Sequence, residues 1–513
     1  MKEKIQGFEA LEKDTHASLT QDKDAAIKES KTNDKQEEQE RVTACLMPSK
    51  SKPVNSVSPA LLPQVLGTGM AALAQVDIGA IFSYPGVTLP QLLDETSDDL
   101  IFSTTQAALF GSVIYLGAMV GSFLASMPMV RLGQRVTLLI ALPLSFASWV
   151  TLVLAPSVWM VLAARLSQGL ALSLMTSSST TYVAELAHSS VRGRLIAAMD
   201  LSRQMGSLFI FSLGTSPLSW RQVALTAALM NTILPFIGFL LLPNSPRWSA
   251  TRGRTDDARR SLTFFRGHSY DTEKELDAII NQLQNPSKDT SVSLQLRQLR
   301  EPAILRYVII MSVVLFLMHF NGSSVIPAYI VIIMNTARVE MSSYLAAIAV
   351  CITKIAGTFC FGFVIDRIDR RPLFTVTCLI SAVSMAILGC FFFDQENSQY
   401  IQHLEWVPLL CLTTYAFFSA SPVIGLLRSE LFPTSVRSSV VPILYTTFFV
   451  GAFLALQTYP YIVVALGPHG AFWLFSVCNL TLIMIVVSTI PETRGKTLEQ
   501  ITEIQRRATR HNE

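Results

Sequence analysis

Charged side chains interrupt long apolar stretches of this chain at several places, and two of these places bear most on function. Asp200 and Arg203 lie three residues apart in one stretch, and Lys354 lies in another. If these stretches cross a lipid bilayer, each charge costs roughly 2.5–3.5 kcal/mol on insertion scales unless it is paired or hydrated. Residues kept at that cost are candidates for the reversible, non-covalent binding of a polar solute.

Helix geometry places the two cations near the middle of a membrane. Arg203 lies 11 residues beyond Arg192, and Lys354 lies 12 residues before Asp366. At 1.5 Å per residue, both are about 16–18 Å from the helix end. The acid three residues before Arg203 is spaced to pair with it on one helix. Lys354 then needs another partner, either Asp77 or an anionic solute.

His319 adds a group that can gain or lose a proton near neutral pH. Asn321 and Ser324 follow it with neutral hydrogen-bonding groups. A lone histidine in an apolar span can equally be a hydrogen-bonded packing residue. Since a poorly paired carboxyl group at Asp77 or Asp200 could also accept a proton, the residues alone leave proton coupling open.

The elements that must position these residues are membrane-spanning helices. Half of the 513 residues are hydrophobic and only 15% are charged, and the apolar runs are long enough to cross a hydrocarbon core of about 30 Å. We expect an all-α membrane protein with twelve transmembrane helices. They are expected near residues 60–84, 105–129, 136–155, 158–182, 194–216, 219–242, 304–333, 342–365, 372–393, 406–429, 440–465 and 469–490.

The chain is a duplicated unit, because three landmarks occur twice at nearly the same interval. The offsets are 245, 236 and 248 residues for segments 185–192 and 430–437, the basic turns ending at Arg135 and Arg371, and segments 243–247 and 491–495. Each copy should hold six of the twelve helices. Membrane proteins built of two parallel repeats usually bind their solute where the repeats meet.

Five segments follow from this division. They are a disordered cytosolic tail at 1–58, the first six-helix half at 59–247, a cytosolic linker with amphipathic helices at 248–303, the second six-helix half at 304–490, and a short cytosolic tail at 491–513. The first tail is polar and lacks a sustained apolar period. In the linker, Thr272 and Glu275 have the spacing of a capping box before a helical pattern of apolar residues.

The distribution of basic residues predicts the orientation. Lys and Arg crowd the loops on one side of the expected bundle, whereas the opposite loops carry mainly acids such as Asp94 and Asp394. The positive-inside rule then places the basic loops and both termini in the cytosol. We expect a multi-pass protein of the plasma membrane, the default location for such a chain.

Several function classes lack support. The one candidate phosphate loop, at 495–497, has Ile490 where its first glycine should stand. No nucleophile triad or zinc-protease helix is present, the seven cysteines lack metal-site spacing, and no nucleic-acid patch stands out. We expect no enzyme activity, catalytic residue, metal or cofactor. Gradient-driven transport of a small solute through the lipid bilayer remains, and the oligomeric state is open.

Six motifs together resemble the sugar porter family of the major facilitator superfamily. They are Arg165-x-x-x-Gly169, Glu185 with Arg192-Gly193, and segments 243–247, 366–371, 430–437 and 491–498. The resemblance covers residues 59–505, and segment 84–91 is similar to the insect trehalose-transporter branch. It implies the major facilitator fold, with two six-helix halves that alternate access to a central site.

The resemblance also implies a cytoplasmic gate of charged residues that latch the halves together and separate when the carrier opens inward. Exposed ion pairs contribute about 0–1 kcal/mol each, so a network of them can hold a gate that must still open. The same residues would also satisfy the positive-inside bias alone. The expected gate residues are Arg135, Glu185, Arg192, Asp366, Arg370, Arg371, Glu430 and Arg437.

The solute site is where this chain departs from the family. Such carriers use Gln and Asn, because amides bind hydroxyls without bringing net charge into a low-dielectric cavity. At the matching positions this chain has charged or different groups, with Asp200 for a Gln and Lys354 for an Asn. The expected solute-binding residues are Asp200, His319, Asn321, Ser324 and Lys354.

The leading functional hypothesis is therefore a carrier of a sugar or sugar-like solute of the trehalose or hexose class. Facilitative uniport is favoured over proton symport, because Ser83 stands where proton-coupled members have an acid. Two alternatives are kept. Lys354, Arg203 and His319 favour a carrier of an organic anion or other charged metabolite, and a non-transporting nutrient sensor is the third hypothesis.

Overall fold

The computed structural model describes residues 60–96, 99–267, 269–284, 301–397, 404–432, 434–494, 496 and 500. These residues belong to one unit and form helices without any strand. The expected tail at 1–58 lies outside the described residues. So do 285–300 of the expected linker, most of the expected tail at 491–513, and the side chain of Arg437.

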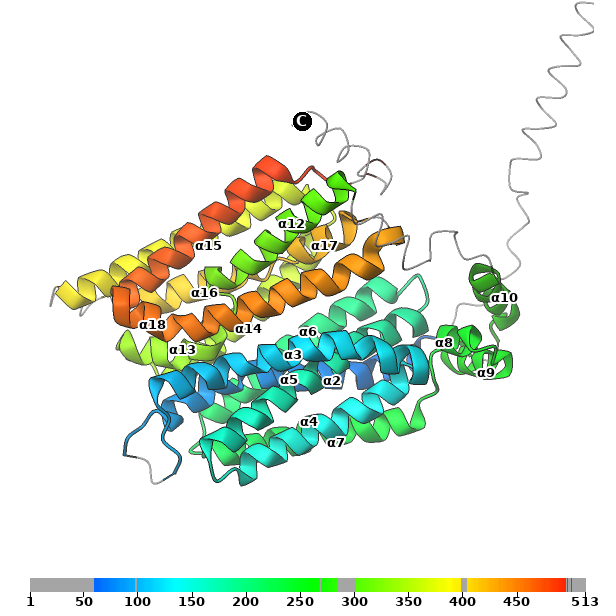
Figure 1. Cartoon of the computed structure of the whole chain (residues 1–513), viewed down its shortest axis with the longest axis horizontal. Helices are drawn as coiled ribbons and strands as arrows, with labels where there is room; N and C mark the ends of the chain where they lie inside the picture. Colours follow the sequence, from blue (N-terminus) through cyan, green and yellow to red (C-terminus); the bar gives the residue numbers. More distant parts are fainter. Residues whose placement is uncertain are drawn as a thin grey trace, which may run out of the picture. The chain divides into compact units, whose positions relative to one another are not determined.

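The first repeat folds into six long helices, which can be followed in Figure 1. They are α2 (Leu61–Leu92), α3 (Thr104–Leu132), α4 (Gln134–Leu154), α5 (Val158–Leu186), α6 (Arg192–Gly214) and α7 (Trp220–Leu241). Ser103 and Ser219 begin α3 and α7 with capping boxes, in which each serine exchanges hydrogen bonds with a glutamine three residues later. These polar caps fix where the two helices begin.

In the second repeat, two of the expected spans are each broken into shorter helices. Its elements are α12 (Pro302–Leu317), η1 (Met318–Asn321), α13 (Val325–Thr336), α14 (Ser343–Val364), α15 (Arg370–Asn397), α16 (Val407–Ser419), α17 (Val423–Glu430) and α18 (Thr434–Thr489). Gly322, with φ 101°, ends η1 in the left-handed region that favours glycine. Pro422 stands at the start of α17 and separates it from α16.

The number of spans is consistent with the twelve expected. Within the described residues, ten segments are long and apolar enough to cross a membrane. The charged α6 is not among them, although its 23 residues would span about 34 Å. Helix α18 counts once but is divided by Gly467, whose φ is 72°. When α6 is included and α18 is counted as two helices, the bundle has the twelve spans of the major facilitator fold.

Three short helices follow the first repeat: α8 (Pro246–Thr251), α9 (Thr255–Arg266) and α10 (Thr272–Gln284). Ala258, Leu262 and Leu276 form their small core, against which Ile279 and Ile280 pack. The amphipathic helix expected after Thr272 is therefore confirmed, and α9 adds a second. Because α8 packs on α5 and α9 on α2, we call this end of the bundle the linker end and the opposite end the distal end.

The expected capping box at Thr272 is wrong. The helix begins at Thr272 itself, and the carboxylate before it, Asp271, accepts hydrogen bonds from the side chain and backbone of Lys274. Glu275 is engaged elsewhere, because both of its oxygens accept from Arg266 at 2.6 and 2.9 Å. A bidentate guanidinium–carboxylate pair is stronger than a single bond to a backbone N–H, so it determines the position of Glu275.

Glycines bring the helices that carry the site into close contact. A Cβ atom added at Gly79 of α2 would overlap the carbonyl oxygen of Arg203 on α6, and one added at Gly206 would overlap that of Val76. Small residues permit such backbone approach in membrane helices. As a result, Arg203 lies directly against the middle of α2.

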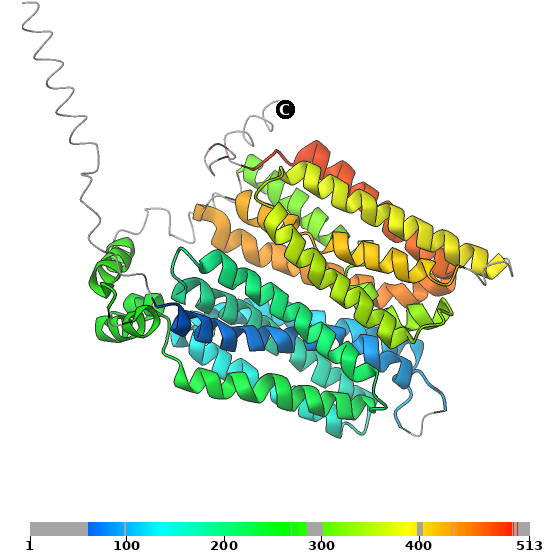
Figure 2. The same cartoon turned by 180° about the vertical axis from the view of Figure 1, so that it is seen from behind.

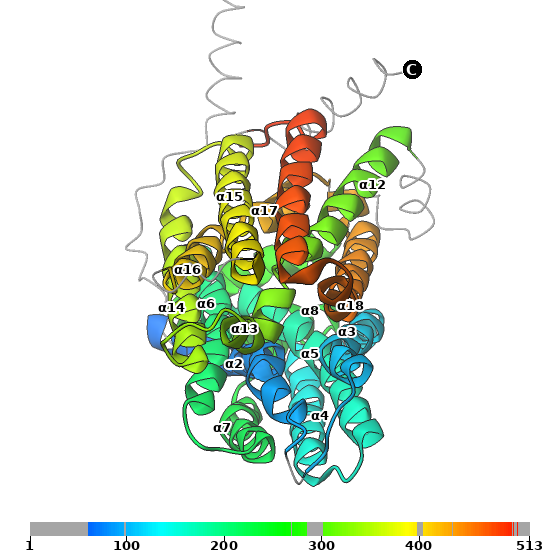
Figure 3. The same cartoon turned by 90° about the vertical axis from the view of Figure 1, so that its left-hand side faces the viewer.

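The two repeats face each other (Figure 3), and polar contacts join them toward the distal end. Helix α3 packs on α18, α2 on α13 and α6 on α14. Tyr461 OH donates to Thr105 Oγ1 at 3.0 Å, and Ser112 Oγ donates to Gln457 Oε1 at 2.8 Å. All four residues lie in the distal halves of their helices. The described polar contacts between α3 and α18 therefore close the distal end.

Candidate functional site

A polar network joins α2, α5 and α6 in the first repeat. Gln75 Nε2 donates to Ser179 Oγ at 2.9 Å, and Arg203 Nε donates to Gln75 Oε1 at 3.0 Å. Arg203 Nη2 pairs with Asp200 Oδ1 at 2.9 Å, which confirms the pair expected from the spacing. The Asp200 side chain is 58% exposed. Because a carboxylate facing lipid at this depth is very costly, it faces water between the repeats.

Lys354 lies across from this network on α14. Cys351 Sγ donates to the carbonyl oxygen of Gln204 at 3.6 Å, so α14 packs on α6 at this level (Figure 2). The two helices run in opposite directions, and Lys354 lies one turn from Cys351 toward the linker end. This places Lys354 at the level of Asp200 and Arg203 along the α6–α14 contact. Within the described residues, no hydrogen bond or ion pair engages its ammonium.

Asp77 is not the partner of Lys354, contrary to one of the two expectations. Its carboxylate accepts from Ser145 Oγ at 2.6 Å and from Trp149 Nε1 at 3.0 Å. Both donors lie on α4, and the Asp77 side chain is fully buried. Two donors from a neighbouring helix satisfy this carboxyl group, so it holds α2 against α4.

His319 and Ser324 form a buried pair at η1. His319 Nδ1 lies 2.5 Å from Ser324 Oγ, and its ring meets the ring of Phe448 edge to face at 4.3 Å. His319 is 3% exposed, and its Nε2 has no partner within the described part of the chain. The structure therefore brings these two predicted residues together but packs the imidazole against an aromatic ring.

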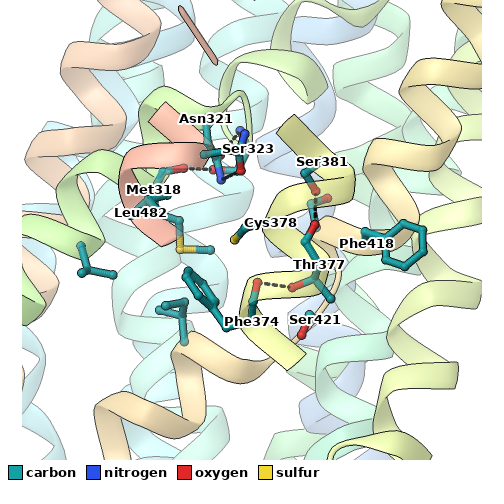
Figure 4. A pocket seen from close by; sticks show the side chains of 14 residues that line it. Met318, Asn321, Ser323, Phe374, Thr377, Cys378, Ser381, Phe418, Ser421 and Leu482 are labelled. Atoms are coloured by element: carbon teal, nitrogen blue, oxygen red, sulfur yellow. Dashed lines mark hydrogen bonds between the residues drawn. The ribbon is translucent and has the colours of Figure 1, made fainter. Parts of the chain in front are cut away.

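Asn321 points into a different place, a cavity inside the second repeat (Figure 4). Asn321 Nδ2 donates to Asn479 Oδ1 at 3.4 Å, and Asn321 Oδ1 accepts from Ser323 N at 3.0 Å and Tyr415 OH at 3.3 Å. The cavity is lined from η1, α12 and α15 to α18, and none of the other four predicted solute residues lines it. Asn321 is thus separate from the α6–α14 contact.

The gate residues of the first repeat bind within that repeat. Glu185 Oε2 accepts from Gln134 Nε2 at 3.0 Å and also from the Ser245 hydroxyl. Arg135 donates to the carbonyl oxygens of residues 239 and 240 at 2.8 Å each, where a cation satisfies the end of α7. Arg192 donates to the carbonyl oxygen of residue 187 at 3.3 Å. Glu185 and Arg192 therefore have separate partners.

The second repeat has the same arrangement, with an arginine in the place of a glutamine. Glu430 Oε1 pairs with Arg370 Nη2 at 3.3 Å, and Glu430 Oε2 accepts from Thr493 Oγ1 at 2.6 Å. Arg370 thus takes the place of Gln134, and Thr493 takes that of Ser245. Arg371 donates to the carbonyl oxygen of Val487. The two acids of the duplicated motif each tie a basic turn to the segment after the sixth helix.

Asp366 contributes its backbone to the same cluster. Its carbonyl oxygen accepts from Arg494 Nη2 at 2.9 Å, while Arg494 Nη1 pairs with Asp369 Oδ1 at 3.1 Å. The Asp366 residue itself is exposed. The eighth gate residue, Arg437, lies in α18, but its side chain is not described.

Glu492 caps the start of α15, and its removal should destabilise the protein in a pH-dependent way. It accepts from the backbone N–H groups of Arg370 and Arg371 at 3.0 Å each. Burial raises the pKa of this carboxyl group, but these bonds and those from residues 493 and 494 outweigh it and lower the pKa below 4.5. A lowered pKa adds stability above the ordinary value, which is lost as the pH falls through the folded value.

We therefore expect Glu492→Gln to lower the melting temperature at neutral pH and to differ less from the parent protein in acid. Thermal unfolding of the detergent-purified pair across this pH range measures the difference. A gap that stays constant with pH would show that the charge of Glu492 is not what stabilises α15.

Two residues important for this site were not expected from the sequence. Gln75 joins Arg203 to α5, and Trp149 donates to the buried Asp77. An amide only two residues from an acid in an apolar span was the available signal for Gln75. No comparable signal exists for Trp149, because an indole in a span is ordinarily a packing residue.

Two related helix bundles that meet at one end, with charged residues at the depth of the contact, define a membrane transporter of the major facilitator type. The model of the "Sugar (and other) transporter" family matches residues 11–504, and the chain belongs to this family. It is therefore a multi-pass membrane protein and not an enzyme.

Two individual proteins that are similar to this chain share 21–28% of their aligned residues with it. The chain is 28% identical over 442 residues to the facilitated trehalose transporter Tret1 of Apis mellifera ligustica, covering 85% of this chain and 87% of the relative. It is similar in fold to the xylose transporter XylE from E. coli in a partially occluded inward open conformation, with 21% identity, a TM-score of 0.71, and coverage of 85% and 99%. The inward open conformation of XylE gives a TM-score of 0.70 at 21% identity, with coverage of 86% and 98%.

Proposed function

We propose that this chain carries a sugar or sugar-like solute of the trehalose or hexose class across a membrane by alternating access. Membership in the sugar transporter family is the observation that carries the proposal. The name of a relative, a facilitated trehalose transporter, supports the solute class. The closed distal end, with Asp200 exposed beside α14, fits a state in which solute enters the site from the linker end.

The proposal includes an orientation and a division of the chain. The linker end and both termini face the cytosol of a cell whose plasma membrane holds the protein, because the basic loops lie at that end. The repeats at 59–247 and 304–490 move against each other, with the linker at 248–303 and tails at 1–58 and 491–513 outside the membrane.

We further propose roles for the two residue sets. Asp200, His319, Asn321, Ser324 and Lys354 contact the solute during the cycle, and Asp200 and Lys354 are the two placed at the α6–α14 contact. The eight gate residues latch the repeats when the cytosolic end closes. The described partners of Glu185 and Glu430 lie within their own repeats, which fits the released state of such a latch.

Facilitative uniport is proposed rather than proton symport. Ser83, which replaces an acid of proton-coupled members, is 1% exposed on α2 and does not titrate in the physiological range. A second candidate function is transport of an organic anion. It is favoured by one observation: the ammonium of Lys354 has no hydrogen-bond or ion-pair partner among the residues that the structure describes.

Uptake by purified protein in liposomes tests this function. We expect saturable entry of labelled trehalose or glucose that is unchanged by an imposed pH gradient. Uptake driven by the gradient would establish symport instead. Binding of these sugars without any flux would favour the nutrient sensor, and flux of organic anions alone would favour the second candidate.

A further inference from the structure

We propose that Lys354 and Arg203 together bind a carboxylate of the transported solute, which is then a monoanionic sugar acid of the hexuronate class. This inference rests on the proposed transport function and narrows its substrate. It follows from three features of the α6–α14 contact: where the two cations lie, which of their donors are unused, and what charge remains.

The two cations come from different repeats and lie at the same level. Arg203 belongs to α6, and Lys354 belongs to α14. The bond between Cys351 and the carbonyl oxygen of Gln204 at 3.6 Å fixes the register of these helices. Gln204 adjoins Arg203, and Cys351 lies one turn from Lys354. A ligand at this level therefore touches both repeats, as a transported solute must.

Both cations keep donors that no protein group uses. Arg203 Nε donates to Gln75 and Arg203 Nη2 donates to Asp200. Its Nη1 has no hydrogen bond within the described residues. Lys354 Nζ likewise has no partner there. Guanidinium and ammonium groups form short, charge-assisted hydrogen bonds with carboxylates, which are roughly twice as strong as neutral ones.

The remaining charge selects a monoanion. Arg203 and Lys354 contribute two positive charges, and Asp200 contributes one negative charge, so the cluster holds one net positive charge. When the site closes and excludes water, an uncompensated charge there is costly, and a single carboxylate neutralises it. A phosphate ester carries about 1.5 to 2 negative charges at neutral pH and would leave an excess. A hexuronate therefore fits better than a hexose phosphate.

Asp200 is the competing partner for Lys354. In the present arrangement Asp200 pairs with Arg203 at 2.9 Å and its side chain is 58% exposed. Two cations at one level of the α6–α14 contact, with the acid bonded to one of them, can bind an anion. A switch of Asp200 to Lys354 on closure is the alternative that the experiment must separate.

The test uses the full chain and two readouts, ligand-induced thermal stabilisation for binding and competition of uptake in liposomes for transport. The probes are glucuronate, glucose, glucose 6-phosphate and trehalose. We expect glucuronate to bind at least about tenfold more tightly than glucose, and Lys354→Gln to remove that preference because the carboxylate loses a cationic partner. Lys354→Arg should retain the preference for glucuronate over glucose. Lys274→Gln, the same change at an exposed side chain of α10, should leave that preference unaltered.

Asp200→Asn separates the two arrangements. Removal of a negative charge beside an anion site should tighten glucuronate binding several-fold. If Asp200→Asn and Lys354→Gln instead reduce transport of every sugar equally, the two residues pair with each other and the inference is wrong. Stronger binding of glucose 6-phosphate than glucuronate would also overturn it.

Failure of this inference differs from failure of the proposed function. Uptake of glucose or trehalose without binding of glucuronate would contradict the sugar-acid site and leave sugar transport intact. Absence of flux for all probes would contradict the transport function, and the binding measurements with Lys354→Gln would still decide whether the cations hold a carboxylate.

Discussion

Replacement of Arg370 by alanine is expected to be among the most damaging single changes at the linker end. The Arg370 side chain is 9% exposed and pairs with Glu430, itself 26% exposed, at 3.3 Å. Its loss leaves a largely buried carboxylate without its cation, which costs about 3 kcal/mol, the low end for broken buried pairs. It also removes the bond to the carbonyl oxygen of Ile365. The melting temperature of the purified protein should fall by several degrees, and transport should fall with it.

Arg494→Ala is the matched control for this experiment. Arg494 pairs with Asp369 at 3.1 Å in the same cluster, but the two side chains are 37% and 54% exposed. Exposed pairs contribute about 0–1 kcal/mol, so the melting temperature should hardly change. Equal effects of the two substitutions would mean that burial of the Arg370–Glu430 pair is not what makes it important.

A methyl group at Gly79 is expected to disrupt the bundle at the solute site. The Cβ atom of Gly79→Ala would overlap the carbonyl oxygen of Arg203, a backbone atom that cannot rotate away. The helices α2 and α6 must then separate, at a cost of about 1–3 kcal/mol or more for overpacking. Separation also lengthens the 3.0 Å bond between Gln75 and Arg203. We expect a lower melting temperature and loss of glucuronate binding together.

Gly69→Ala on the same helix provides the control. A Cβ atom there would meet nothing within 4 Å, and alanine favours the helix by up to about 1 kcal/mol over glycine. This variant should melt at the same temperature as the parent protein or slightly above it. A normal melting temperature for Gly79→Ala would show that α2 and α6 are not in tight contact.

The span pattern and the paired motifs could be predicted from the sequence, because both depend on local features. Apolar runs determine where helices cross a membrane, and duplication makes the Glu185 and Glu430 segments visible as equivalents. The pair of Asp200 and Arg203 was predictable for the same reason, since residues at i and i+3 of one helix are neighbours.

The partners of the gate acids depend on the tertiary structure and were not predictable. A spacing of seven residues would place Arg192 near Glu185 only on an unbroken helix. In fact α5 ends at Leu186 and α6 begins at Arg192, and Glu185 binds Gln134 and Ser245 instead. The hydrogen bond between Asn321 and Asn479 was not predictable for a similar reason, because it depends on η1 and the left-handed Gly322.

The polar bonds that join α3 to α18 at the distal end have a kinetic consequence. If the empty carrier rests with that end closed, only a minor fraction of molecules offers a competent site to solute on the distal side of the membrane, and the apparent affinity from that side falls by the same fraction. Return of the unloaded protein then limits net entry. Vesicles preloaded with substrate should therefore exchange label faster than empty vesicles fill, and weakening the bond between Tyr461 and Thr105 should narrow that difference.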